Sequence, residues 1–361
     1  MSTSSSADSR PPRLRRFRVD VSTIILLVVV VQSLLLLGLG YWGAQRLVSA
    51  VGESAHRADH LRVEDKVNSF LGKAMSVVEA VAASTSVRTG DGQGADSAEL
   101  LWVLLQQSPE LDSLYVATDA GRMVMAQRYP EPAVRHVVRE RGATVETWEY
   151  KGPTSLRADA QNSLVTRHTG EHATHNDPRS RAWFQAAARQ GRPAWTAPYL
   201  FALAQEPGVS YAIPAWGEDG DANRGDGPGK GAGNGRSTGR VIGTAAGSGT
   251  RMRVASGDVT LGRLSDFVSQ FSRAGYGDSA LLSADRHVLA RSDLPGRLQR
   301  LAPPSDGLLG AIHARMLDDG SAHDTASVHF PLTHEGTRYL VRASHIATTG
   351  WQLVSWVSED Q

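Results

Sequence analysis

The chain contains no cysteine. This absence excludes disulfide bonds, thiol nucleophiles, iron–sulfur clusters and thiolate zinc sites. An excess of charge of one sign is also lacking, since 38 Lys and Arg residues are balanced by 37 Asp and Glu residues. Without a strong positive field, we expect no nucleic-acid partner. P-loop, HExxH and Ser-x-x-Lys motifs are missing as well. We therefore expect no catalytic residue, no metal and no cofactor.

A long apolar run, Thr23–Gly43, is the clearest positive feature. Only Gln32 and Ser33 interrupt its apolar middle. About 20 helical residues span the hydrocarbon core of a bilayer. Tyr41 and Trp42 lie where an interfacial aromatic belt is usually found. We predict an uncleaved transmembrane helix at residues 23–43.

The basic residues beside this run predict its orientation. Arg46 is the only basic residue just after it, whereas several arginines precede it: Arg10, Arg13, Arg15, Arg16 and Arg18. The positive-inside rule places residues 1–22, a disordered basic tail, in the cytoplasm. The bulk of the chain is then extracytoplasmic (periplasmic), anchored in the inner membrane. A cleaved signal peptide is the alternative, but its apolar region covers only about 7–15 residues. Arg15-Arg16 also resembles part of a twin-arginine export signal.

After the apolar run the pattern predicts an α+β fold. Residues 44–84 carry apolar side chains at spacings of three and four, which predicts one long stalk helix. Its apolar stripe can face a partner helix, giving a homodimer, or its own domain. Two sheet-containing segments follow, at residues 85–272 and 273–357. Residues 217–239 are rich in Gly, Asp, Asn and Arg, and we predict a flexible insertion there.

Short alternating segments predict the strands, and amphipathic segments predict the helices. The predicted strands are 114–118, 123–127, 144–150, 163–168, 209–215, 241–245, 280–283, 287–290, 327–332, 337–344 and 351–357. The predicted helices after the stalk are 97–107, 181–189 and 261–271.

One strip of the chain concentrates groups that can bind a small polar solute. It contains an arginine and four aromatic residues: Arg181, Trp183, Phe184, Trp195 and Tyr199. Such a cluster can stack on a solute and pair with its charge.

The same strip, with its surroundings, resembles the double Cache (dCache) family of extracytoplasmic sensor domains. The resemblance rests on Asp177-Pro178-Arg179-Ser180-Arg181-Ala182-Trp183-Phe184, on Pro109–Val116 with Asp119–Met125, and on Gly257-Asp258-Val259-Thr260-Leu261 followed by Leu264–Phe267. It covers about residues 44–357 and implies two tandem PAS-like modules with mixed antiparallel sheets. The Pro207-Gly208-Val209-Ser210 variant is most similar to sensors fused to class III nucleotide cyclases.

The resemblance implies roles for individual residues. Arg181 and Trp183 contact the polar head of the ligand, Tyr199 lines the opposite wall and Asp258 accepts a ligand ammonium. Phe184 replaces a frequent Tyr. In the amino-acid-binding subgroup an Asp follows that Tyr by two residues, where this chain has Phe201. The ligand class therefore stays open between a carboxylate, an amine-like solute, a purine-like ring and no ligand.

Each assignment has a structural alternative. Asp177 and Arg179 can cap and pair at a helix start, Trp183 and Trp195 can be core aromatics, and Asp258 can cap the helix that begins at Leu261. A histidine cluster, His168, His172 and His175, suits a metal only if it is helical, whereas Thr169, Gly170 and Thr174 favour a loop.

Three functions remain open from the sequence. The first is a membrane-anchored sensor, forming part of a larger or truncated receptor whose output is a cyclase, a chemoreceptor or a kinase. The second is a ligand-free dimerisation module. The third is an anchored metal-dependent hydrolase, which only the histidine cluster favours.

Overall fold

The computed structural model describes residues 21–88, 94–140, 143–152, 165–173, 176–218, 250–293, 307–318 and 327–359. The chain divides into two units, residues 1–55 and 56–361. In the first unit, Ile24–Trp42 is a 19-residue helical segment with a mean hydropathy of 2.6, long and apolar enough to cross a membrane. The second unit contains two antiparallel sheets. The predicted α+β class, with an N-terminal apolar helix, a long helix and two sheets, is confirmed.

The helical elements are α1 (Val21–Ala83), α2 (Thr85–Arg88), α3 (Ala95–Gln107), the 3₁₀ helix η1 (Pro178–Ser180), α4 (Ala182–Gln190), α5 (Leu261–Arg273) and α6 (Gly307–Asp318). The strands are β1 (Ser113–Thr118), β2 (Met123–Gln127), β3 (Ala133–Glu140), β4 (Ala143–Gly152), β5 (Val165–Ala173), β6 (Ala194–Trp195), β7 (Tyr199–Leu200), β8 (Pro207–Glu218), β9 (Thr250–Thr260), β10 (Asp278–Leu282), β11 (Val288–Arg291), β12 (Val328–His334), β13 (Thr337–Ile346) and β14 (Trp351–Ser358).

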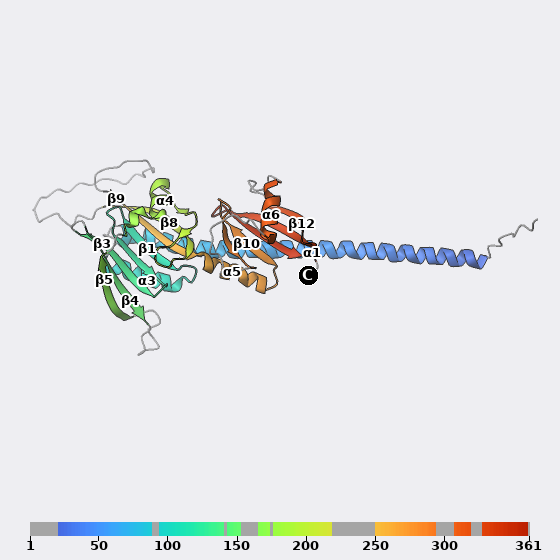
Figure 1. Ribbon diagram of the computed structural model, residues 1–361, viewed down its shortest axis with the longest axis horizontal. Helices are drawn as coiled ribbons and strands as arrows, with labels where there is room; N and C mark the ends of the chain where they lie inside the picture. Colours follow the sequence, from blue (N-terminus) through green and yellow to red (C-terminus); the bar gives the residue numbers. More distant parts are fainter. Residues whose placement is uncertain are drawn as a thin grey trace, which may run out of the picture. The chain divides into compact units, whose positions relative to one another are not determined.

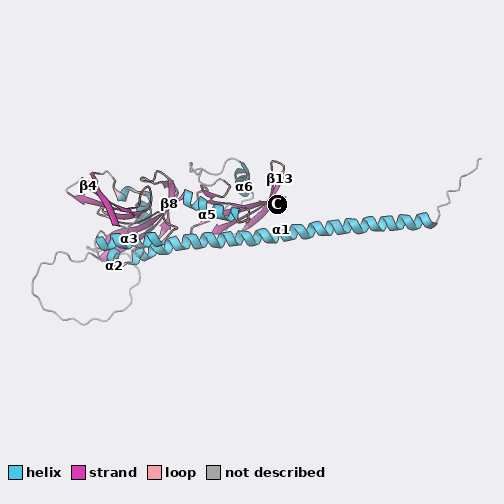
Figure 2. Ribbon diagram, turned by 90° about the horizontal axis from the view of Figure 1, so that it is seen from below, coloured by secondary structure: helices cyan, strands magenta, loops and turns pink. Residues whose placement is uncertain are grey.

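The first sheet has the strand order β5-β4-β3-β2-β1-β9-β8-β6, with β7 also paired to β8. The second has the order β11-β10-β14-β13-β12. Within residues 56–361 the two sheets lie one after the other along α1, as both views show (Figures 1 and 2). Helix α5 connects β9 of the first sheet to β10 of the second.

The apolar stripe predicted on the stalk helix packs against this chain's own sheets. Val63, Val67, Leu71 and Val78 are buried in one core with side chains of both sheets and of α3 and α5. The sequence left two packing partners open for the stripe, a partner helix or the chain's own domain, and the structure has the second. Burying such a stripe is what stabilises a helix of this length in water.

A polar contact joins α1 to the second sheet. His60 is 1% exposed, and its Nδ1 and Nε2 lie 2.6 Å and 2.9 Å from the hydroxyls of Ser355 and Ser344. Because Ser344 donates its own proton to Glu64, it accepts from Nε2–H, and Ser355 donates to Nδ1. Burial, followed by the nearby His56 and Arg342, lowers the pKa of His60 to about 3, so the ring is neutral.

Several elements differ from the sequence expectation. Strand β3 and helix α6 were not predicted. Residues 257–261 are the end of the central strand β9 and the start of α5, the helix that leads from the first sheet to the second. Thr260, not Asp258, caps α5, because its hydroxyl accepts from the amide of Arg263. The structural alternative holds for Asp177, whose carboxylate caps η1 and pairs with Arg179.

Some predictions fall on residues outside the described ranges. These are the strand at 241–245 and most of the insertion at 217–239, of which Gly217 and Glu218 end β8. His175 also lies outside, whereas His168 and His172 belong to β5 rather than to a loop. Among the described residues, no three His, Asp or Glu side chains gather in a way that suits a metal ion.

Gly257 allows β9 to approach α1 closely. A Cβ atom at this position would lie 2.9 Å from Val78 Cγ2 and 3.0 Å from Leu111 Cδ2. We expect Gly257→Ala to lower the free energy of unfolding by about 1–3 kcal/mol, because the packed core has to shift to admit the methyl group. The measurement is urea unfolding of the full chain in detergent, followed by tryptophan fluorescence.

The matched control is Gly72→Ala in α1, where an added Cβ meets nothing within 4 Å. It should stabilise the protein by up to about 1 kcal/mol, because alanine is the better helix former. Equal effects of the two substitutions would show that Gly257 is not a close-packing position.

Candidate ligand-binding site

The two faces of the first sheet differ in character because side chains alternate along each strand. In β1, Leu114 and Val116 belong to the core that includes α1 and α3. On the other face, Tyr115 and Ala117 pack with residues of α4, including Trp183. This second face is the floor of the candidate site.

A row of polar side chains crosses the floor. The strand registers place Ser210 of β8 opposite Asp258 of β9, Asp258 opposite Ser113 of β1, and Ser113 opposite Gln127 of β2. Directly opposed residues in antiparallel strands share a face. A second row, two residues further along, contains Tyr115, Met125 and Arg135 of β1, β2 and β3.

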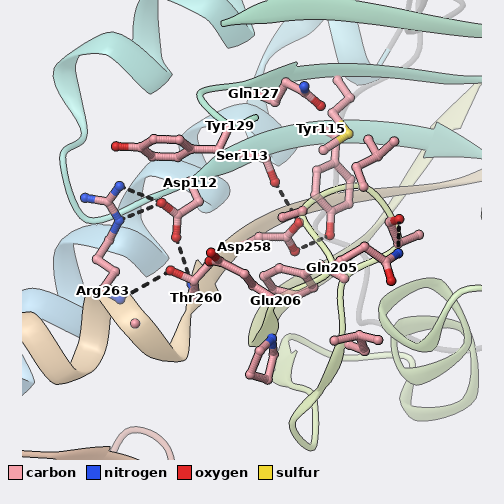
Figure 3. A pocket seen from close by; sticks show the side chains of 18 of the residues that line it. Asp112, Ser113, Tyr115, Gln127, Tyr129, Gln205, Glu206, Asp258, Thr260 and Arg263 are labelled. Carbon is pink, nitrogen blue, oxygen red and sulfur yellow. Dashed lines mark hydrogen bonds and ion pairs between the residues drawn. The ribbon is translucent and has the colours of Figure 1, made fainter. Parts of the chain in front are cut away.

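A cavity of about 1170 Å³ lies on this floor. Its lining includes Asp258, Tyr115 and Gln127 from the sheet, and Arg181 and Trp183 from the α4 segment. Further lining comes from the 199–207 segment, from the loops at 109–112 and 129–130, and from Phe70 of α1 and residues of α5. Figure 3 shows the side chains of Asp258, Ser113 and Tyr115 converging, with Asp112 and Arg263 at one side.

Hydroxyl groups surround the carboxylate of Asp258. Tyr115 and Ser210 donate to Oδ1 at 2.6 Å and 2.5 Å, and Ser113 donates to Oδ2 at 2.6 Å. Tyr199 in turn donates to Ser210 at 2.7 Å, because the Ser210 proton is already directed at Asp258. The described residues give Asp258 hydroxyl donors but no cationic partner. Burial raises its pKa to about 6, although the hydroxyl bonds act in the opposite direction.

The two tyrosines of this group remain protonated. Burial, followed by the charge of Asp258, raises the pKa of Tyr115 and that of Tyr199 well above the ordinary value. Both phenols therefore act as hydrogen-bond donors to the Asp258 group at any physiological pH. A ligand ammonium would find acceptor oxygens here, and its charge would replace the missing counter-ion.

Arg181 and Arg135 bring positive charge to another part of the lining. The Nε and Nη2 atoms of Arg181 donate to Asn176 Oδ1 at 2.9 Å and 2.5 Å. Arg135 forms an ion pair with Glu146 and lies 5.0 Å from the centroid of the Trp148 ring. With Arg135 paired to a carboxylate and Arg181 bonded to a neutral amide, Arg181 is the better placed of the two for a ligand carboxylate.

Of the six predicted site residues, the structure brings four to one cavity. Arg181, Trp183, Tyr199 and Asp258 line it. Phe184 does not; it is 5% exposed and packs with Ala187 and Trp183 in the core behind the cavity.

Trp195 also lies away from the cavity lining, in a different aromatic cluster. Its ring centroid is 5.3 Å from that of Tyr211 and 5.2 Å from that of Trp351, the first residue of β14. Trp195 therefore connects the first sheet to the second.

Phe201 forms part of the cavity wall because residue 208 is a glycine. A Cβ on Gly208 would lie 2.2 Å from the Phe201 ring. The ring of Tyr199 meets that of Phe201 edge-on, with centroids 5.1 Å apart. Where the resemblance expects a second carboxylate, the structure thus has an apolar wall.

An ion pair lies at one side of the cavity. Asp112 Oδ1 accepts from Arg263 Nε at 2.7 Å, and Asp112 Oδ2 accepts from the amide of Thr260 at 2.7 Å. Arg263 also donates to the carbonyl of Pro109 at 2.7 Å. These bonds fix the start of α5 to the loop before β1.

Sequence reasoning missed Ser113, Tyr115, Gln127 and Asp112 as cavity residues. The available signal was the alternation in β1 and β2, where polar or large side chains recur every second residue on one face. That signal identifies a face, but it does not say which strands lie beside each other.

Comparisons with known proteins support the fold. No protein-family model matches the chain, and no curated protein matches it in sequence. Among solved structures, the sensory domain of the Campylobacter jejuni chemoreceptor Tlp3 (CcmL) matches with a TM-score of 0.52 and 11% identity, covering 87% of this chain and 97% of that one. The Tlp3 ligand-binding domain in complex with L-valine has a TM-score of 0.51 and 11% identity, covering 87% and 96%. Its complex with 4-methylisoleucine has a TM-score of 0.50 and 12% identity, covering 85% and 92%.

The chain therefore has the fold of these chemoreceptor sensory domains.

Proposed function

We propose that this protein is a membrane-anchored, extracytoplasmic small-molecule sensor of the double Cache type. The observation that carries the proposal is Asp258, a buried carboxylate on the floor of a large cavity with hydroxyl donors and no cationic partner among the described residues. A buried charge without a counter-ion is costly, and a carboxylate with a perturbed pKa in a cavity marks a candidate functional site. The matching fold of the Tlp3 sensory domain, solved with L-valine and with 4-methylisoleucine, supports the same function.

In this proposal the ligand carries an amine, a carboxylate or both. An ammonium binds at Asp258 and Tyr115, a carboxylate at Arg181, and the body of the ligand packs on Trp183 and Tyr199. Residues 85–272 form the ligand-binding module and residues 273–357 a second module.

The signal is read through α1 and β14. Phe70 of α1 lines the cavity, and Trp351 of β14 contacts Trp195 of the first sheet. The ligand must bind two arrangements of these elements with different affinity in order to signal. A homodimer through the stalk helix and an output domain (cyclase, chemoreceptor or kinase) complete the proposal.

The test is a thermal-shift screen of the full chain in nanodiscs against amino acids, amines and organic acids. A ligand present at about 100 times its dissociation constant should add roughly 2.7 kcal/mol of stability. We expect Arg181→Ala or Asp258→Asn to abolish the shift, since each removes a charged group that the ligand pairs with.

Arg192→Ala is the matched control, because Arg192 is exposed and does not line the cavity. It should leave the shift unchanged. If the folded protein gives no shift with any compound, the sensor proposal fails and the ligand-free dimerisation module is the better description.

A further inference from the structure

Gln127 has an acceptor on the cavity floor that no group in the described chain satisfies. The residue is 2% exposed, as buried as its floor neighbours Ser113 and Tyr115. Its Nε2 donates to the carbonyl of Glu131 at 3.2 Å. This bond fixes the orientation of the amide, because the flipped amide would direct oxygen against oxygen.

The other atom of that amide, Oε1, has no hydrogen-bond partner. A buried acceptor left unpaired keeps the cost of its lost hydration. Buried side-chain oxygens of this kind are normally paired, so an unpaired one in the lining of a cavity points to a donor from outside the chain.

The position of Gln127 determines how far its Oε1 lies from the other acceptor on the floor, the Asp258 carboxylate. Gln127, Ser113 and Asp258 are consecutive members of one cross-strand row. With strands about 4.8 Å apart, Gln127 lies two spacings, or about 10 Å, from Asp258. Ser113 lies between them, and its hydroxyl proton is committed to Asp258. The two acceptors therefore address separate groups of a ligand.

The cavity has the size and the charge for an extended cation. Its volume, about 1170 Å³, exceeds the range of roughly 300–1,000 Å³ that is common for small-molecule sites. The charged residues of its lining are mostly acidic: Glu110, Asp112, Glu206, Asp258 and Asp266, against Arg135, Arg181 and Arg263. Arg135 and Arg263 are ion-paired with Glu146 and Asp112, and Glu110 is ion-paired with Lys73. The remaining charged residues of the lining are Glu206, Asp258 and Asp266 against Arg181.

We propose that the cavity selects an elongated ligand with two nitrogen donor groups, an ammonium bound at Asp258 and a second amino or guanidinium group bound at Gln127 Oε1. Basic amino acids and linear diamines are the chemical classes that fit. The inference rests on the proposed sensor function and specifies the ligand of the same site.

The test compares L-lysine with L-norleucine, which has the same carbon chain without the terminal amine. Isothermal titration calorimetry is performed on the full chain in nanodiscs. A hydrogen bond to a charged group is worth about 1.5–3 kcal/mol, so lysine should bind about 10-fold tighter or more. In Gln127→Met, which keeps the side-chain shape, this advantage should fall to near one-fold while norleucine binding stays the same.

The outcomes separate the two proposals. If norleucine binds in an Asp258-dependent way and lysine binds no tighter, an ordered water satisfies Gln127, and the inference is overturned while the sensor stands. If Gln127→Met weakens both probes equally, Gln127 is only a packing residue, and the inference is overturned as well. If neither probe binds and the metabolite screen gives no Asp258-dependent ligand, the sensor function fails and this inference fails with it.

Discussion

Asp112→Ala should lower the free energy of unfolding by about 3–5 kcal/mol, the largest effect that we expect from a single substitution. The Asp112 side chain is 9% exposed and the Arg263 side chain 25%. Removing one partner of a buried pair leaves the other charge uncompensated, which costs more than the pair contributes when intact. The amide of Thr260 at the start of α5 loses its acceptor at the same time. Urea unfolding of the full chain in detergent measures the change.

Asp293→Ala is the matched control, since Asp293 pairs with Arg291 only two residues away in a more exposed position. It should cost less than about 1 kcal/mol, as exposed ion pairs do. Asp112→Asn should fall between the two, because the amide oxygen still accepts from Thr260. A loss of less than 1 kcal/mol for Asp112→Ala would contradict a structural role for this pair.

Asp258 should make the ligand-free protein less stable as the pH rises from about 4 to about 6. Burial raises its folded-state pKa from 3.8 to about 6. In this window the unfolded chain has lost the proton and the folded chain still holds it, so stability falls with rising pH. The loss of unfolding free energy caused by Asp258 is absent below about pH 4 and complete above about pH 6. At its full extent it amounts to roughly 3 kcal/mol. A salt-bridged aspartate, whose folded-state pKa is lowered, would instead make the protein more stable as the pH rises.

The measurement is the difference in unfolding free energy between Asp258→Asn and the original protein at several pH values from 4 to 7. Other titrating groups cancel in this difference, which should move in favour of the variant by about 3 kcal/mol and then level off above pH 6. If the difference in unfolding free energy instead moves in favour of the original protein as the pH rises, the hydroxyl hydrogen bonds lower the pKa of Asp258 by more than burial raises it. The same proton opposes an ammonium ligand, so ligand affinity should weaken as the pH falls through 6.

Local patterns predicted most of the elements. The alternation in Met123–Gln127 and the 3–4 spacing in α1 and α5 identified elements that the structure contains. Strand β9 was missed because Gly257 and Asp258 are poor strand formers. Tertiary structure overrides that preference, since Gly257 admits the close approach of α1 and Asp258 faces the cavity.

The site was harder to predict than the fold, because it depends on strand register. Ser113, Gln127 and Asp258 become neighbours only when β2, β1 and β9 are paired in one register. No local sequence pattern predicts that Ser113 lies opposite Asp258. The resemblance identified Arg181, Tyr199 and Asp258, which come from different segments, but it did not reveal the hydroxyl groups around the carboxylate.

The contact between His60 and the second sheet has a consequence for how the chain is made. Its partners Ser344 and Ser355 follow His60 by 284 and 295 residues. At a synthesis rate of about 5–20 residues per second, this part of α1 waits roughly 15–60 s for its partners. During that interval its apolar stripe is open to chaperones and proteases. A chain that stops before β14 lacks Ser355, Trp351 and Leu353, which this helix needs for its polar contact and for the burial of its apolar stripe.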